Sequence, residues 1–240
     1  MESLIVITAL VIGGSSGIGL ATAARLHAAG DTVHIAGRDA ARLQAAVDEQ
    51  PGLVPHRLDA ADAPALVSLL NELETVDRLV VTLSGNTGAG TFVDLDIDVL
   101  RTAFEEKFWP TVTAVKSAVK HLSGHGSITL VGAVTARTGM PGTAGIGSLN
   151  AAVEGLVAPL AAELALIRVN AVSPGYVDTP WWNMLPDADR RALFDSVAAG
   201  LPTRRIATAD DVAQAIVLLA TNPSMTGTIV EVDGGAHLTA

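Results

Sequence analysis

The chain has 240 residues, of which 49% are hydrophobic, so it can form one large domain with a buried core but is short for two domains and a linker. Its 15 basic and 25 acidic residues give a formal net charge of −10, which argues against a DNA or RNA partner. The absence of cysteine excludes disulfides, thiolate catalysis and cysteine-based zinc sites, and it fits a reducing cytoplasm. We therefore expect one cytoplasmic domain over residues 1–240.

The N-terminal apolar run LIVITALVIGG predicts a buried first strand. It follows Glu2 rather than a basic segment, lacks a small-residue cleavage pattern, and is too short to span a bilayer. We therefore expect no membrane partner.

From this run onward, apolar segments of strand length alternate with segments of helical periodicity. Strands are predicted at 5–12, 32–37, 53–58, 78–83, 127–132, 167–172 and 228–233. Helices are predicted near 17–29, 39–49, 62–73, 97–121, 144–165 and 208–220, with Asp39, Asp62 and Thr208 as N-caps. The pattern predicts a doubly wound α/β fold: a parallel seven-stranded sheet with helices on both faces and ligands at the carboxyl ends of the strands.

A glycine-rich turn follows the first predicted strand. The segment GGSSGIG at 13–19 runs into a predicted helix, and its glycines let backbone N–H groups approach a pyrophosphate. Two other interpretations are a turn without a ligand and a nucleophile elbow, because residues 13–17 also fit G-x-S-x-G. The elbow is disfavoured since only 12 residues precede it. The binding interpretation assigns cofactor contacts to Gly13, Ser15, Ser16, Gly17, Ile18 and Gly19.

The second predicted strand ends in AGRD, at the place where a dinucleotide site reads the adenosine ribose. An acidic residue there would bind the 2′-hydroxyl of NAD, but this chain has Gly37 followed by Arg38. A guanidinium can pair with the 2′-phosphate of NADP, so NADP(H) is the expected cofactor. The alternative for Arg38 is an ordinary solvated surface cation.

The turn GGSSGIG, the strand end AGRD, the segment RVNAVSPGYVDT and the terminal TGTIVEVDGG occur in an order and spacing that resembles the short-chain dehydrogenase/reductase family. The resemblance covers essentially all 240 residues. It implies that Asp59 contacts adenine, and that Ser84 and Gly85, in VTLSG where the family usually reads NNAG, lie beside the cofactor. The loop that holds the nicotinamide carboxamide would contain Pro174, Gly175, Val177 and Thr179.

The catalytic positions depart from the family pattern. The family's Ser near the end of the fifth strand falls on Ala133, and its Tyr-x-x-x-Lys motif falls on Ile146 and Asn150. The supporting Asn of the family falls on Lys107. A shifted alignment cannot restore the motif, because the chain's one tyrosine is Tyr176 and no Tyr-x-x-x-Lys occurs. We expect an atypical active site.

Some chemistry can survive these replacements. Loss of a general acid costs roughly 10²- to 10⁴-fold in rate, so acceptors that need no protonation on oxygen, such as an iminium, an alkene or a quinone, are favoured over simple ketones. The candidate catalytic residues are Lys107, Tyr176 and Asn150, which can also bond the ribose. Alternatively, Lys107 faces solvent and Tyr176 only packs.

A substrate lid is expected near 180–200, where Trp181 and Trp182 suggest a flat or apolar substrate wall, core packing or a subunit contact. The spacing of His121 and His125 resembles a metal site, but we interpret them as an exposed helix end and expect no metal. Family resemblance implies a homodimer or homotetramer formed through the two long central helices, and Pro159 predicts a kink in the second of them.

The sequence leaves three functions open. The first is an NADP(H)-dependent oxidoreductase with a degenerate catalytic site that acts on a small apolar molecule. The second is a non-catalytic NADP(H)-binding sensor or assembly partner. The third is a redox-neutral enzyme on the same scaffold.

Overall fold

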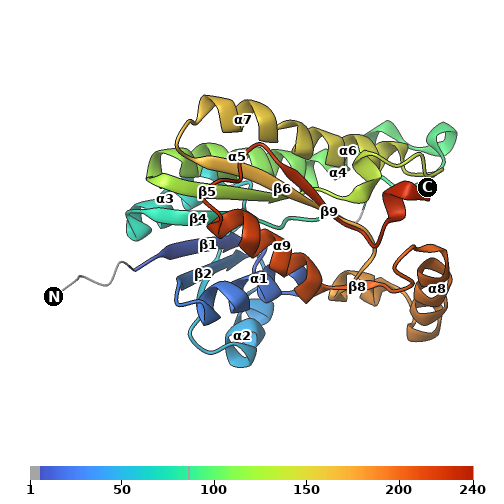
Figure 1. Ribbon diagram of the computed structural model, residues 1–240, viewed down its shortest axis with the longest axis horizontal. Helices are drawn as coiled ribbons and strands as arrows, with labels where there is room; N and C mark the ends of the chain where they lie inside the picture. Colours follow the sequence, from blue (N-terminus) through green and yellow to red (C-terminus); the bar gives the residue numbers. More distant parts are fainter. Residues whose placement is uncertain (1–5, 86, 240) are drawn as a thin grey trace.

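The computed structural model describes residues 6–85 and 87–239. Within these ranges, seven parallel strands form one sheet in the order β3-β2-β1-β4-β5-β6-β9 (Figure 1). The strands are β1 (Thr8–Ile12), β2 (Thr32–Gly37), β3 (Val54–Arg57), β4 (Val76–Val81), β5 (Leu122–Val131), β6 (Arg168–Pro174) and β9 (Ile229–Val232). The predicted doubly wound sheet is therefore confirmed. Of the first predicted strand, residue 5 lies outside the described residues.

The apolar character of the strands reflects burial on both faces of the sheet. In β1, Leu10 and Ile12 contribute to one hydrophobic core, whereas Ala9 and Val11 contribute to the other, and all four side chains are at most 2% exposed. Neighbouring residues of a strand point to opposite faces, so a strand covered on both sides must be apolar throughout.

Helices cover both faces of the sheet (Figure 1). One face carries α1 (Gly17–Ala28), α2 (Ala40–Glu49) and α9 (Ala209–Thr221). The other carries α3 (Ala63–Leu73), α5 (Phe108–Ala118), α6 (Ala144–Gly155) and α7 (Val157–Glu163), with α4 (Ile97–Glu106) packed on α5 and α6.

Both long central helices are interrupted, and each break precedes a proline. The helix predicted over 97–121 divides at Lys107, because Pro110 has no N–H to offer the carbonyl of Glu106. The helix predicted over 144–165 divides at Leu156, which confirms the disruption expected from Pro159. His121 ends a short 3₁₀ turn that continues α5, as expected for a helix end, whereas His125 lies in β5, so the prediction was wrong for His125.

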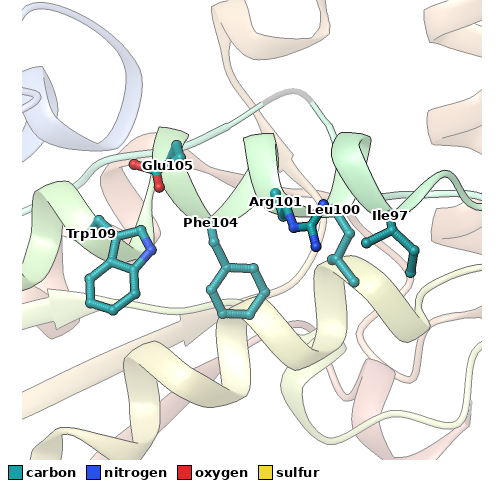
Figure 2. Close-up of a pocket in the computed structure, with 6 residues that line it drawn as sticks. All are labelled: Ile97, Leu100, Arg101, Phe104, Glu105 and Trp109. Atoms are coloured by element: carbon teal, nitrogen blue, oxygen red, sulfur yellow. The ribbon is translucent and has the colours of Figure 1, made fainter.

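The outer side of α4 and the start of α5 expose apolar side chains. Ile97 is 58% exposed and Trp109 is 50% exposed. Together with Phe104 they line a groove of about 300 Å³ that also includes Leu100, Arg101 and Glu105 (Figure 2).

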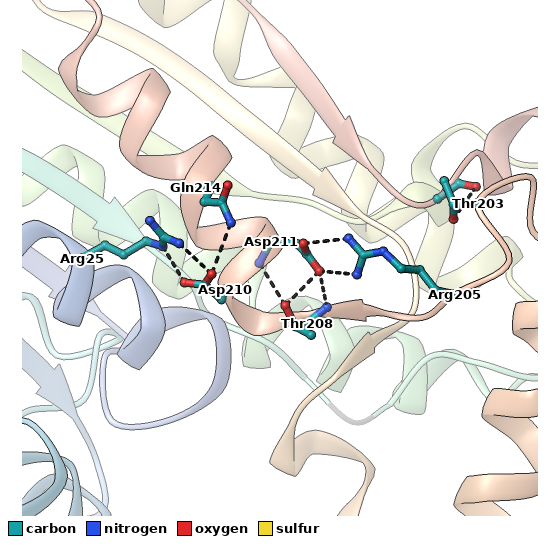
Figure 3. Close-up of polar contacts among 8 residues, drawn as sticks. Arg25, Thr203, Arg205, Thr208, Asp210, Asp211 and Gln214 are labelled. Carbon is teal, nitrogen blue, oxygen red and sulfur yellow. Dashed lines mark hydrogen bonds and ion pairs between the residues drawn. The ribbon is translucent and has the colours of Figure 1, made fainter.

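The three predicted N-caps are confirmed. The Asp39 side chain accepts hydrogen bonds from two backbone N–H groups of α2, and Asp62 accepts one from α3. Thr208 and Asp211 form a reciprocal capping box at the start of α9 (Figure 3). Asp210 beside them accepts a 2.6 Å bond from the guanidinium of Arg25, which ties α9 to α1.

The segment after β6 leaves the main sheet. It forms β7 (Val177–Asp178), a 3₁₀ turn (Pro180–Met184) and α8 (Asp187–Gly200), and β8 (Ala207–Thr208) then pairs with β7. Sequence periodicity did not predict α8. Every residue of α8 is at least partly exposed, so packing imposes no strong apolar stripe on it.

Among the described residues, one helical stretch, Ala144–Glu163, is long and apolar enough to cross a membrane. It comprises α6 and α7, which pack against the sheet. A single stretch of this kind is weak evidence for a membrane span, because core helices satisfy the same criterion.

Candidate active site

The glycine turn lies where the strand order reverses, between β1 and its neighbours β2 and β4. Gly13 has a φ of +86°, and a Cβ there would lie 2.7 Å from Oγ1 of Thr82. A Cβ on Gly19 would lie 2.2 Å from the carbonyl oxygen of Gly13. Backbone and neighbouring strand thus pack too closely for side chains at these two positions, which explains the glycines.

The turn exposes polar groups toward the carboxyl edge of the sheet. Ser16 caps α1 with an extended backbone but without a side-chain hydrogen bond to the helix. Among the described residues, the hydroxyls of Ser15 and Ser16 have no hydrogen-bond partner. A Cβ on Gly17 would lie 3.4 Å from Thr179, so the fold brings the predicted carboxamide loop against the turn. Ile18 forms part of the first turn of α1.

Arg38 is exposed at the end of β2, and no carboxylate in the described part of the chain lies within ion-pairing distance of it. The backbone carbonyl of Arg38 accepts a 3.3 Å hydrogen bond from Nε of Arg57, which brings a second guanidinium to this edge. The sequence reasoning missed Arg57, because only the pairing of β2 with β3 places it there.

Asp39 follows Arg38, but it is committed to helix α2. The backbone N–H groups of Arg42 and Ala41 donate to its carboxylate, and these bonds with the nearby cations Arg42 and Arg57 hold the pKa of Asp39 below its usual range. Asp39 is therefore bonded to α2, while Arg38 and Arg57 place cationic groups at this edge. Asp59 is exposed, and its carboxylate accepts a 2.9 Å bond from the N–H of Ala61.

The remaining predicted cofactor residues lie on loops at the same edge. Pro174 ends β6, and a Cβ on Gly175 would lie 2.8 Å from Cα of Asp233. Ser84 and Gly85 follow β4, and the indole of Trp181 donates a 3.2 Å hydrogen bond to the carbonyl of Gly85. The segment after β7 is therefore bonded to the loop after β4.

Trp182 is the centre of a small aromatic group. Its indole donates a 3.0 Å bond to the carbonyl of Val177, and its ring stacks on Tyr176 at a centroid distance of 5.6 Å. The rings of Trp181 and Phe194 meet Trp182 edge to face. This packing gives Tyr176 a structural role, and its catalytic role stays a prediction.

Lys107 and Asn150 meet in the interior. The Lys107 ammonium donates a 2.7 Å hydrogen bond to Oδ1 of Asn150 and a 3.1 Å bond to the carbonyl of Gly132. Lys107 is 6% exposed, so the alternative of a solvent-facing lysine was wrong. Burial lowers the pKa of Lys107 to about 8, although the nearby carboxylate of Glu154 opposes the shift.

Ala133 and Ile146 are both half-buried, and Ala133 follows Gly132, whose carbonyl accepts the bond from Lys107. Ala133 begins the 3₁₀ turn Val134–Ala136, and Ile146 lies one helical turn before Asn150. The amide of Asn150 donates to the carbonyl of Ile146 at 2.9 Å and to the hydroxyl of Thr135 at 3.0 Å. Neither Ala133 nor Ile146 has a side chain that can donate or accept a proton.

Glu154 lies one turn beyond Asn150 and was not predicted as a site residue. Its side chain is 5% exposed and accepts a 2.8 Å bond from Arg137, which also pairs with Glu231. Burial raises the pKa of Glu154, while Arg137 and Lys107 oppose the shift. An isolated acid in the otherwise apolar segment VEGLVAPLA was the available sequence signal.

The sheet order and the glycine turn at its reversal define the class: a Rossmann-like α/β protein. A family model described as Enoyl-(Acyl carrier protein) reductase matches residues 12–237. The chain belongs to the short-chain dehydrogenase/reductase family of oxidoreductases.

Relatives cover nearly the whole chain. Cis-4-hydroxycyclohexanecarboxylate dehydrogenase of Sinomonas cyclohexanicum is 33% identical, over 95% of both chains. Short-chain dehydrogenase/reductase ATR9 of Stachybotrys chlorohalonatus (strain IBT 40285) is 31% identical, over 95% of this chain and 96% of its own. A solved small-chain dehydrogenase in complex with NADPH matches with a TM-score of 0.86 and 33% identity, over 97% of this chain and 99% of its own.

Proposed function

We propose that the protein is an NADP(H)-dependent oxidoreductase with an atypical catalytic site that acts on a small apolar molecule. The observation that carries the proposal is the pairing of a closely packed glycine turn with Arg38, which has no carboxylate partner among the described residues. The NADPH complex of the similar dehydrogenase supports the choice of cofactor.

The residues at the edge fit such a cofactor. The space beside Gly13 and Gly19 accepts no side chain, and the hydroxyls of Ser15 and Ser16 have no partner among the described residues. The start of α1 favours an anionic pyrophosphate, and Arg38, with Arg57 beside it, would pair with the 2′-phosphate. When bound, NADPH supplies a hydride.

Further contacts to the cofactor are assigned to the loops of the same edge. Asp59 would contact adenine, and Ser84 and Gly85 would lie beside the cofactor. The carboxamide would be held by the loop made of Pro174, Gly175, Val177 and Thr179.

The buried pair of Lys107 and Asn150 would supply positive charge to a catalytic site that has no tyrosine at the family position. Lys107 holds its ammonium against Asn150, so the positive charge comes from the α4–α5 junction, while an amide stands on α6. Because Ala133 and Ile146 cannot donate a proton, the site is suited to acceptors that need none on oxygen, or to slow reduction of carbonyl compounds.

Calorimetric titration with NADPH and NADH tests the cofactor proposal. Arg38→Ala should weaken NADPH binding roughly 10- to 100-fold, the effect of losing a charge-assisted hydrogen bond, and leave NADH binding nearly unchanged. Arg101→Ala, which removes an exposed arginine from α4, is the matched control. Absence of NADPH binding by the wild type, or equal losses for both cofactors, would exclude this assignment.

A second candidate is a non-catalytic NADP(H)-binding sensor or assembly partner. Ala133 and Ile146 favour it because they lack proton-transferring groups, and so does the enclosure of Lys107. Cofactor binding without consumption of NADPH across iminium, quinone, alkene and ketone acceptors would support it. Turnover of any one of these acceptors would eliminate it.

Restoration of a catalytic constellation provides a sharper comparison. Ala133→Ser, Ile146→Tyr and Asn150→Lys would place a second ammonium against Lys107, since the present Nζ-to-Oδ1 distance is 2.7 Å. Adding Lys107→Asn to this threefold variant exchanges the positions of the lysine and the asparagine, so the site keeps a single cation. The fourfold variant should therefore reduce ketones faster than the threefold variant, provided that NADPH binding is retained.

The lid and the oligomer are also proposals. The segment near 180–200 would close over substrate, supported by the bond from Trp181 to Gly85. The exposed apolar groove of α4 and α5 supports a homodimer or homotetramer (Figure 2). Light scattering of the wild type and of Trp109→Glu tests the contact, and an unchanged mass would exclude this face.

A further inference from the structure

Two histidines connect the edge strand β3 to its neighbour β2. His34 lies in β2 and His56 in β3, and Nδ1 of His34 is 2.9 Å from Nε2 of His56. The ring centroids are 5.1 Å apart, so the two nitrogens lie between the rings and face each other. One nitrogen therefore donates a proton and the other accepts it, which makes a direct side-chain bond between the strands.

Strand β3 has few other side-chain contacts of its own. It is the edge strand of the sheet and pairs with β2. Of its four residues, only His56 has a side chain that is not exposed. Within β3, the bond to His34 is therefore the side-chain contact that ties the strand to β2.

The strand end that this bond secures carries Arg57. Neighbouring residues of a strand point to opposite faces, so the side chain of Arg57 lies away from the imidazole of His56. Nε of Arg57 donates to the carbonyl of Arg38 at 3.3 Å, and the N–H of Leu58 donates to the carbonyl of Gly37 at 2.8 Å. Release of β3 from β2 would separate Arg57 from Arg38.

The bond between the histidines tolerates one added proton but not two. An imidazolium still donates to a neutral imidazole, whereas two imidazolium rings present N–H groups to each other and repel. Burial lowers the pKa of both rings, and the charge of His56 lowers the pKa of His34 further. Glu72 on α3 opposes the shift at His56, while the paired neighbours Leu10 of β1 and Ala36 of β2 are apolar. The second proton therefore binds below pH 6.5, the ordinary pKa of histidine.

We propose that His34 and His56 are positioning residues for the cofactor: their hydrogen bond holds Arg57 beside Arg38, and uptake of a second proton in acid breaks the bond and releases Arg57. This role rests on the proposed function, because Arg57 discriminates between cofactors only if a 2′-phosphate binds at this edge. The added charge alone would attract an anionic cofactor more strongly. A broken bond and an added charge therefore change NADPH affinity in opposite directions.

Calorimetric titrations with NADPH and NADH at about pH 8 test the hydrogen bond while both rings are neutral. His56→Ala should weaken NADPH binding about fivefold, the effect of one neutral hydrogen bond, and leave NADH binding unchanged. His56→Gln should restore the wild-type affinity, since its amide nitrogen takes the place of Nε2. His125→Ala, which removes an exposed histidine from β5, is the matched control. Unchanged NADPH affinity in His56→Ala, or equal losses for both cofactors, would overturn the positioning role.

The same titrations continued down to about pH 5 test the second proton. In His56→Gln an amide faces a single imidazole, so this variant keeps its bond at every pH. Protonation of the 2′-phosphate affects both proteins equally, and the ratio of their affinities isolates the histidine pair. The wild type should become about fivefold weaker than His56→Gln as the pH falls. A constant ratio, or tighter binding by the wild type in acid, would overturn the release of Arg57.

Hydrogen exchange of the cofactor-free protein, measured by NMR, separates this role from the proposed function. The protection factor of the Leu58 amide should fall in acid in the wild type and stay constant in His56→Gln. His34→Asn, whose amide takes the place of Nδ1, should behave like His56→Gln, and thermal unfolding verifies that both variants are folded. Constant protection in the wild type overturns the acid-sensitive bond whether or not NADPH binds. Loss of protection in a wild type that binds no NADPH would refute the proposed function and the role of Arg57 together, but not the bond between the strands.

Discussion

Replacement of Lys107 by methionine should change how the stability of the protein depends on pH. The Lys107 ammonium is buried, and its two bonded partners, Gly132 and Asn150, are neutral oxygens. Burial without a directly bonded anion disfavours the charged form, which lowers the pKa from 10.5 to about 8. Methionine fills a similar volume but does not titrate.

The shift fixes both the sign and the size of the effect. Between pH 8 and 10.5 the unfolded chain binds a proton at Lys107 that the folded chain does not bind, so the free energy of unfolding should rise with pH across this interval. Below pH 8 Lys107 is protonated in both the folded and the unfolded chain, so the free-energy cost of burying its charge is constant. A shift from 10.5 to about 8 corresponds to about 3 kcal/mol at about 1.4 kcal/mol per pKa unit.

Chemical denaturation at a series of pH values, from below 8 to above 10.5, measures the effect. Other groups also titrate in this range, so the informative quantity is the difference in unfolding free energy between the wild type and Lys107→Met. That difference should move in favour of the wild type by up to about 3 kcal/mol as pH rises. Parallel curves for the two proteins would refute the burial argument.

Three further predictions concern the turn, the buried acid and the lid. Gly19→Ala should destabilise the protein by about 1–3 kcal/mol in denaturant titrations, because its Cβ would meet the carbonyl of Gly13. Gly155→Ala is the control: a Cβ there meets open space, so this variant should be as stable as the wild type or more stable. The raised pKa of Glu154 means that stability gains as pH falls through the interval above 4.5, and Glu154→Gln should flatten this part of the curve. Trp181→Phe loses the bond to Gly85 and should speed NADPH release in stopped-flow experiments, and an unchanged release rate would refute the role of this segment as a lid.

The sequence by itself determined the sheet and the turn. Strands buried on both faces must be apolar throughout, so β2 was predicted with its observed bounds. The caps Asp39, Asp62 and Thr208 depend on bonds to residues two or three positions away, and such local chemistry can be read from the chain. The glycine turn was predicted from GGSSGIG between a strand and a helix, and the structure explains Gly13 and Gly19 by close packing around them.

Contacts between distant residues were decided only by the tertiary structure. Lys107 follows two glutamates and resembles a surface lysine locally, yet the break before Pro110 turns it inward to Asn150, 43 positions away. Arg57 reaches the end of β2 only through the pairing of β2 with β3. Burial, and with it the lowered pKa of Lys107, depends on which elements pack around a side chain, and no local pattern in the chain records that packing.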